Sequence, residues 1–440
     1  MKKFFETIKN IFKIEELRNR ILYTLGLILI YRAGSFVVIP GINPEAVTSM
    51  SQSVGGNGLL GLLDMFSGGA FGNASIFGLG IMPYISASIV IQLLGIVVPY
   101  FQKLQKEGES GRRKLNQITR YLTIGVLIVQ IPAYIAALRG MLPPAAFVLG
   151  ANSFLFNLVA AVVLIAGTMF VMWLGEKITD KGIGNGVSLI IMVGIIARLP
   201  YALLAEVNSR FSGQAGGAVM LVVEIVLLFL VFAATIALVQ AVRKIPVQYA
   251  KRIVGNKQYG GVRQYIPLKI NAAGVMPIIF AQALMFLPML FTRVEFMQGF
   301  VATMGNMQGF WYNFVFAVLV IAFTWFYTAV TINTTQMAED MKRNGGFIPG
   351  IKPGKKTAEY LDNVMTRITL PGSIFLAIVA ILPVFAMMLG IDQNFAYFYG
   401  GTSLLILVGV VLDTLKQIES HLLNRHYDGL MKTGRIQGRS

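Results

Sequence analysis

Long apolar stretches alternate with polar segments along the whole chain. A helix of about 20 apolar residues crosses the roughly 30 Å hydrocarbon core of a bilayer. The pattern therefore predicts an all-α polytopic membrane protein with ten transmembrane helices. The predicted spans are 21–40, 75–98, 118–138, 153–174, 186–204, 218–241, 271–291, 311–334, 368–390 and 400–417.

The segment before the first span, residues 1–20, has a different pattern. Apolar residues recur there at helical spacing, with Lys and Glu between them, which predicts an amphipathic helix lying on the membrane surface. No small-residue cleavage site follows the first apolar run, so we do not expect a cleavable signal. The apolar positions are Phe4, Phe5, Ile8, Ile11, Phe12 and Leu17.

The ten spans divide into two sets of five, residues 21–204 and 205–417, followed by a polar tail at 418–440. Because five is odd, the two halves would have opposite orientations, a layout common in transport proteins. Two loops of the second half, 242–269 and 337–367, are longer than simple connectors need to be. Both are basic and rich in turn formers, which indicates a docking surface.

Charge fixes the predicted orientation. The chain has 37 Lys and Arg residues and a net charge of +17. Basic residues flanking alternate spans are the positive-inside signature, so the basic segments and both termini are expected in the cytoplasm, where they would attract anionic lipids. All but Arg32, Arg139, Arg198, Arg210 and Arg293 lie in segments 1–20, 101–120, 175–185, 242–269, 337–367 and 415–440.

The residue inventory argues against enzyme chemistry. The chain has no Cys and only two His, His421 and His426, both in the polar tail. Thiolate catalysis, thiolate metal sites and a buried imidazole relay are therefore excluded, and we expect neither cofactor nor metal. The segment 350–357 resembles a phosphate-binding loop, but its glycine spacing is wrong and no strand leads into it.

One acidic residue keeps an alternative open. Glu224 lies inside the sixth predicted span. An ion-coupled small-solute transporter normally carries several ionisable groups at mid-membrane, because they bind or relay the coupling ion. A single Glu gives that function little support, and we favour instead a carboxylate that is paired locally or that reaches the membrane interface.

The most unusual stretch is 57–98. Its apolar piece, 59–66, covers about two helical turns, too short to cross a membrane, and residues 67–73 interrupt it with Ser, Gly and Asn. Such a segment must be covered by protein or line a cavity. It is either a movable pore stopper or a re-entrant packing loop. Downstream, Ile81, Ile85 and Ile89 share one helix face, and Pro83 perturbs the helix there.

Several blocks of the sequence resemble the SecY family of bacterial protein-conducting channels. The resemblance runs from about residue 10 to the end, in the family's order. The blocks are SGGAF (67–71), IMPYISASI (81–89), KEGESGRRK (106–114), GTMFVMWLGE (167–176), GIGNGVS (182–188), PLKINAAGVMPIIF (267–280), FIPGIKPG (347–354) and GGTSLLI (400–406).

The resemblance implies two pseudo-symmetric halves around a central hourglass pore. It assigns a plug within 57–72, formed by Leu59, Leu60, Leu62, Leu63, Met65 and Phe66. It assigns a pore ring of Ile81, Ile85, Val187, Ile191, Ile279 and Ile406. It also assigns polar positions of a lateral gate, between the second and third spans and the seventh and eighth, to Ser86, Gln130 and Asn271.

The same resemblance implies a function and partners. A passive channel would translocate unfolded secretory polypeptides and release transmembrane segments into lipid, driven by a ribosome or by the SecA motor. The partners implied are SecE and SecG subunits, SecA, the ribosome, signal peptides and nascent chains, in a bacterial inner membrane. Docking is expected at Arg243, Lys251, Arg252 and Lys352. Lys352 replaces the family's usual Arg, which retains the charge but loses the planar bidentate donor.

Overall fold

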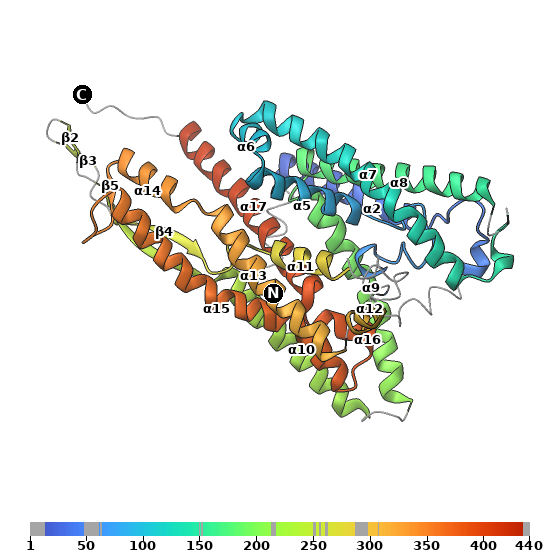
Figure 1. Ribbon diagram of the computed structural model, residues 1–440. Helices are drawn as coiled ribbons and strands as arrows, with labels where there is room; N and C mark the ends of the chain where they lie inside the picture. Colours follow the sequence, from blue (N-terminus) through green and yellow to red (C-terminus); the bar gives the residue numbers. More distant parts are fainter. Residues whose placement is uncertain are drawn as a thin grey trace. The chain divides into compact units, whose positions relative to one another are not determined.

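A computed structural model describes most of the chain in two compact units (Figure 1). The first unit consists of Met1–Ala205 and Gly409–Ser440, and the second of Glu206–Val408. The described residues are 14–47, 61, 64–148, 150, 153–212, 217–249, 252–254, 257–259, 263–286, 298–306 and 308–433. Most of the predicted amphipathic segment 1–20 and four of the six predicted plug residues lie outside these ranges.

Helices dominate the first unit. Its core is formed where α7 and α8 pack together, with Leu127, Ile131, Leu164 and Phe156 fully or almost fully buried. Helix α2 packs against α8, and α5 packs along α7. The helices are α2 (Glu15–Gly34), α5 (Met82–Val97), α6 (Pro99–Lys106), α7 (Glu109–Met141), α8 (Phe154–Lys181), α9 (Gly186–Phe211), which continues into the second unit, and the later part of α17 (Gly401–Thr433).

The second unit is built around two long neighbours, α13 and α15, which run side by side (Figure 1). Helix α11 packs on α13. The elements are α10 (Gly217–Gln240), α11 (Met276–Phe286), α12 (Gln298–Gly305), α13 (Phe310–Thr331), α14 (Thr334–Arg343), α15 (Lys355–Met388), α16 (Gln393–Ala396) and the 3₁₀ turn η4 (Tyr397–Tyr399).

Seven helical segments of the described chain are long and apolar enough to cross a membrane. They contain α7, α8, α9, α10, α13, α15 and the first part of α17, and each matches a predicted span. Helix α10 buries only Glu224 and Thr235, as expected when lipid surrounds an apolar helix. The three other predicted spans overlap with α2, α5 and α11, so a total of ten remains a prediction.

The second predicted span begins as turns. Residues 67–81 form turns and an isolated bridge between Ser75 and Val38, and α5 starts only at Met82. Backbone groups of this segment form hydrogen bonds with other parts of the chain. For example, Ile39 N donates to Ala74 O at 2.9 Å. Helix α5 ends at Val97, and the next helix begins at Pro99, which cannot supply the hydrogen bond that would continue α5.

The long polar loops of the second unit contain β structure that the sequence analysis did not predict. Strand β1 (Val242–Tyr249) pairs antiparallel with β4 (Arg263–Lys269) on one side and β5 (Gly346–Phe347) on the other. Strands β2 (Arg252–Val254) and β3 (Lys257–Tyr259) form a separate hairpin. The sheet therefore joins loop 242–269 to loop 337–367.

A buried ion cluster ties the second unit together. Arg210 donates from Nε to Glu206 Oε1 at 2.7 Å and also pairs with the carboxylate of Glu224. All three side chains are at most 3% exposed. The cluster reaches the segment after α15, because Arg210 Nη2 donates to Gly390 O at 2.8 Å and Asp392 N donates to Glu206 Oε2 at 2.7 Å. Glu224 is thus locally paired.

Replacing Arg210 with Met should destabilise the fold. Two buried carboxylates would lose their cation, and breaking a buried pair costs about 3–5 kcal/mol. Thermal unfolding of the purified protein should show a clearly lowered Tm. The matched control is Arg20→Met, because Arg20 pairs with Glu16 at 3.1 Å on an exposed surface. Such pairs contribute about 0–1 kcal/mol. Equal shifts in the two variants would contradict a structural role for the cluster.

Candidate functional site

The six aliphatic residues assigned to the pore ring all lie in the opening turns of helices or at their caps. Ile81, Ile85, Ile191 and Ile406 are buried, whereas Val187 and Ile279 are half-buried. Four belong to the first unit, namely Ile81 and Ile85 at the start of α5 and Val187 and Ile191 at the start of α9. Two belong to the second, Ile279 in α11 and Ile406 in α17. Their meeting in one ring stays a prediction.

Helices α5 and α11 begin alike. Each starts with Met-Pro, at Met82-Pro83 and at Met276-Pro277. Proline is well tolerated in the first turn, where its missing N–H would have no partner anyway. Ile85 and Ile279 follow their prolines at the same offset. A residue assigned to the pore ring thus follows the same Met-Pro start in each of the two proposed halves. Sequence analysis missed this repeat, although both dipeptides were visible.

Of the six predicted plug residues, the structure describes only Met65 and Phe66. Met65 and Phe66 are buried in the first unit, at 4% and 6% exposure, and Leu59, Leu60, Leu62 and Leu63 lie outside the described residues. The turn that follows is held by charged side chains. Arg32 Nη1 donates to Gly68 O at 2.7 Å, and Arg198 pairs with Asp64.

Sequence analysis missed this pairing, although a signal was present. Asp64 is the one acidic residue between 59 and 73, and Arg32 and Arg198 are among the few basic residues outside the six basic segments. Ionisable groups at membrane depth usually have partners and roles.

The three predicted gate positions lie in separate elements. Ser86 in α5 donates to Met82 O at 3.2 Å, one turn earlier in its own helix. Gln130 is half-buried in α7, which packs along α5. Asn271 follows β4 in the second unit and is 7% exposed, and its Oδ1 has no hydrogen-bond partner among the described residues. Their grouping into a gate stays a prediction.

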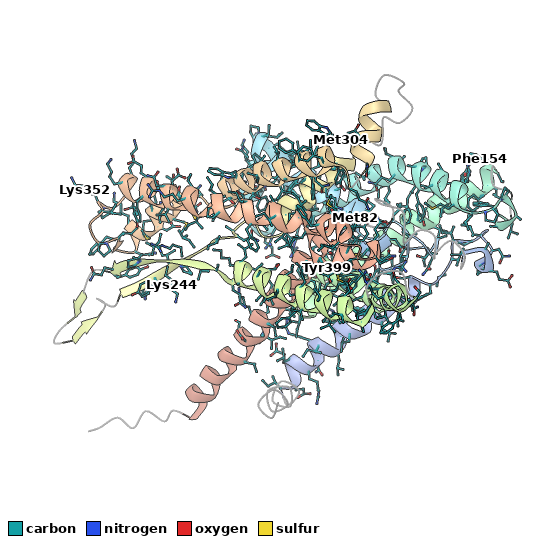
Figure 2. All side chains as sticks on the ribbon, turned by 90° about the horizontal axis from the view of Figure 1, so that it is seen from below. Met82, Phe154, Lys244, Met304, Lys352 and Tyr399 are labelled. Atoms are coloured by element: carbon teal, nitrogen blue, oxygen red, sulfur yellow. The ribbon has the colours of Figure 1, made fainter. Side chains whose placement is uncertain are left out.

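Two of the four predicted docking residues have described side chains, and both lie in the polar loops of the second unit. Arg243 is exposed on β1, and Lys352 is exposed in the turn before α15. Lys352 lies at the same end of this unit as Lys244 of β1 (Figure 2). Arg252 is in β2, where only the backbone is described, and Lys251 lies outside the described residues.

A small apolar core holds these loops together. Ile245 and Val247 point from β1 into it, Met341 comes from α14, and Leu361 and Met365 come from the first part of α15. All are 7% exposed or less. We call the sheet, α14 and the start of α15 the cytoplasmic subdomain, after the side of the membrane that the charge pattern predicts for these loops. The two long basic loops are therefore one packed structure, and its core is separate from the membrane spans.

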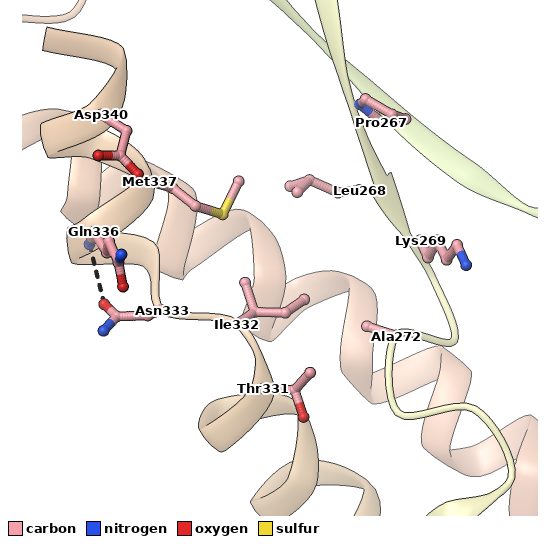
Figure 3. Close-up of a pocket in the computed structure, with 10 residues that line it drawn as sticks. All are labelled: Pro267, Leu268, Lys269, Ala272, Thr331, Ile332, Asn333, Gln336, Met337 and Asp340. Atoms are coloured by element: carbon pink, nitrogen blue, oxygen red, sulfur yellow. Dashed lines mark hydrogen bonds between the residues drawn. The ribbon is translucent and has the colours of Figure 1, made fainter. Parts of the chain in front are cut away.

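A pocket of about 470 Å³ lies where the subdomain meets the end of α13 (Figure 3). Its polar side chains include Lys269, Asn333, Gln336 and Asp340. Asn333 caps α14, because its side chain accepts a hydrogen bond from Gln336 N at 3.0 Å. No cluster of three or more His, Asp or Glu within the described ranges could hold a metal ion.

Comparison with known proteins identifies the family. The SecY family model matches residues 75–415. A protein translocase subunit SecY of Streptomyces scabiei is 43% identical over 433 residues, 96% of this chain and 98% of the relative. That of Halalkalibacterium halodurans is 45% identical over 438 residues, 97% and 100% of the two chains. The chain belongs to the SecY family.

Solved structures share the fold. "The structure of a protein conducting channel" matches with a TM-score of 0.63 at 18% identity, covering 92% of both chains. "Sec61 in the Canine ribosome-channel complex from the endoplasmic reticulum" matches with a TM-score of 0.57 at 16% identity, again over 92% of each chain. The SecY fold, a membrane bundle of helices, is thereby confirmed for this chain.

Membership in the SecY family settles two questions left by the sequence. The chain is a multi-pass membrane protein of a protein-translocation channel family and not an enzyme. The alternative of an ion-coupled small-solute transporter has no support among the relatives, and its one candidate residue, Glu224, is engaged by Arg210.

Leu361→Ala should loosen the cytoplasmic subdomain selectively. Leu361 is 1% exposed in its core, and a buried Leu→Ala change costs about 2–5 kcal/mol. Limited proteolysis should cut within 242–269 and 337–367 faster than in the unmodified protein. Leu370→Ala is the matched control, since Leu370 lies further along the same helix and is 50% exposed. Identical cleavage in both variants would argue against a shared core.

Proposed function

We propose that the chain forms a passive pore through which unfolded secretory polypeptides cross the membrane. The observation that carries this proposal is that the chain is 40–45% identical to protein translocase subunits over nearly its whole length. The positions assigned to the pore ring support it, because all six are aliphatic and begin helices in both units.

An aliphatic ring suits a polypeptide pore. It offers a passing chain no hydrogen-bond partner, and aliphatic contacts are individually weak and non-directional. It can therefore deform around very different side chains at small cost. In the idle channel the same constriction would block ions by excluding water. The paired offsets of Ile85 and Ile279 after Met-Pro support two halves contributing equivalent side chains.

Plug and lateral gate complete the proposal. The segment 57–72 would close the pore at rest. A side opening between the second and third spans and the seventh and eighth would carry Ser86, Gln130 and Asn271, and would release transmembrane segments into lipid. Release into lipid removes the apolar surface of the segment from water, which is favourable by roughly 25 cal/mol for each Å². The unpartnered Oδ1 of buried Asn271 supports a polar role there.

Energy must come from partners, which we propose to be the ribosome or the SecA motor acting on the cytoplasmic subdomain. SecE and SecG subunits would complete the channel in a bacterial inner membrane, with both termini in the cytoplasm. Exposed Arg243, Lys244 and Lys352 at one end of the second unit support this docking site. Basic residues there would attract acidic or RNA-containing surfaces, signal peptides and nascent chains would be the cargo, and anionic lipids would surround the loops.

Photo-crosslinking tests the pore. A stalled secretory chain should crosslink to a photoreactive side chain introduced at Ile85, because the translocating chain would pass within contact distance. The control position is Ile128, which is 62% exposed on α7 and should contact lipid. Crosslinking of the stalled chain at Ile128 but not at Ile85 would refute the assigned path.

Reversing the charges of Arg243, Lys251 and Arg252 to Glu should weaken motor or ribosome binding at least about tenfold at low salt, because charge complementarity steers and orients docking. Binding to membranes carrying the variant channel measures the effect. The same three-charge reversal at Arg112, Arg113 and Lys114, exposed at the start of α7, is the control. Undiminished binding by the first variant would remove these residues from the docking site.

A further inference from the structure

The turn that joins α8 to α9, residues 182–186, ends with the first residue of α9 and so sets where this helix begins. Val187 comes directly after the turn, and Ile191 lies about one helical turn further on, so the start of α9 carries two side chains assigned to the pore ring. Every residue of the turn is buried except Asn185. Whatever holds the turn in place therefore also holds Val187 and Ile191.

Side chains from two distant helices accept hydrogen bonds from the backbone of this turn. Ile183 N donates to Thr24 Oγ1 of α2 at 3.1 Å. Gly184 N donates to Gln417 Oε1 of α17 at 2.9 Å. The two acceptors are 159 and 233 positions away in the sequence, yet all these residues belong to the first unit. The turn is thus tied to α2 and to α17.

Helix α8 holds the other side of the turn. Gly186 N donates to Thr179 Oγ1 at 2.9 Å, and a Cβ on Gly186 would overlap the carbonyl oxygen of Gly175. Asn185 then caps α9, because its side chain accepts a hydrogen bond from Ser188 N at 3.2 Å. Backbone contact with α8 on one side leaves the turn little room to shift, provided that its outer side is held as well.

Helix α17 presents one face to the outer side of the turn. Gln417 and Thr414 are three positions apart and so share a helix face. Gly184 has a φ of +80°, which favours glycine, and a Cβ there would lie 3.0 Å from Thr414 Oγ1. Gly184 is buried, whereas Gln417 is exposed. A substitution at Gln417 therefore removes the acceptor of a buried N–H group with little loss of packing.

We propose that Thr24 and Gln417 are positioning residues for the pore ring. By accepting hydrogen bonds from the turn, they fix the start of α9, and with it the places of Val187 and Ile191. This inference rests on the proposed function as a pore. A buried N–H group without an acceptor is costly, so the turn would shift toward another partner when either acceptor is lost. The two aliphatic side chains would then move with it and open the constriction to water.

Removing an acceptor should raise the ion leak of the resting channel. In the complete channel complex reconstituted in vesicles, Gln417→Leu should increase ion conductance about tenfold, since an unpaired buried donor shifts a local equilibrium by that order. Gln417→Glu keeps an acceptor oxygen at the same reach and should leave the leak unchanged. Thr24→Val and Thr24→Ser form a second pair with the same expected difference, because only Ser retains the hydroxyl.

A matched control separates this role from the loss of any buried hydroxyl. Thr123 in α7 is 0% exposed, and its hydroxyl donates to Thr119 O at 2.7 Å, one turn earlier in its own helix. Thr123→Val should not change the leak. A leak in Thr123→Val equal to that in Thr24→Val would contradict a specific role of Thr24. A leak in the Glu and Ser variants as large as in Leu and Val would show that hydrogen bonding is not the cause.

Hydrogen exchange measured by mass spectrometry tests the contacts without using transport. In complexes in lipid nanodiscs, peptides that cover residues 182–189 should exchange about tenfold faster in Gln417→Leu and in Thr24→Val than in the unmodified protein, because their amides lose an acceptor. The Gln417→Glu and Thr24→Ser variants should retain the protection. Peptides from α7 should exchange at the same rate in all four variants.

The outcomes distinguish the two proposals. Unchanged exchange in both Gln417→Leu and Thr24→Val would show that these side chains do not hold the turn. Faster exchange without a raised leak, in a channel that translocates, would show that the turn does not position the ring. Either result overturns this inference and leaves the channel function intact. If the unmodified channel neither translocates nor crosslinks a secretory chain at Ile85, the proposed function itself fails, and the positioning role fails with it.

Discussion

Polar groups inside a bilayer must find their partners within the protein, and this constraint governs the irregular parts of the chain. An unsatisfied backbone group in hydrocarbon costs several kcal/mol. The turns at 67–81 are possible because side chains of α2 and α7 donate to their carbonyls. The same constraint explains the ion cluster, where Arg210 compensates two buried carboxylates. Irregular backbone and buried charges therefore occur where particular side chains supply the hydrogen bonds or the opposite charge that they need.

Membrane spans were the most predictable part of the fold. The apolar runs that became α7, α8, α10 and α13 are long, continuous and bounded by charge, and nothing competes with a helix there. The second span was harder, because its apolar composition continues through turns that end only at Met82. Composition reports that a residue is buried, but it does not tell whether its backbone is helical or is satisfied by side chains from elsewhere.

The residue types of the candidate site were predictable, but their contacts were not. The isoleucines and the basic loops could be assigned by resemblance. The pairing of Asp64 with Arg198 could not, because the two are 134 positions apart and no local pattern links them. The shared core of the cytoplasmic subdomain was partly predictable. Ile245 and Val247 are two positions apart and are flanked by Lys244 and Gln248, which is the spacing of a strand buried on one face. Tertiary pairing supplied the rest.

Helix α15 has a mechanical consequence. Its first turns carry Leu361 and Met365 in the core of the cytoplasmic subdomain, and the same helix carries Leu376 and Val379 among the buried residues of its apolar span. Its 34 residues reach about 50 Å at 1.5 Å per residue. A force applied to the subdomain is therefore transmitted directly to the membrane span, because no flexible linker separates the two parts of this helix. Only Pro371 and Pro383 interrupt the helix's hydrogen bonding, and they are the places where it can flex.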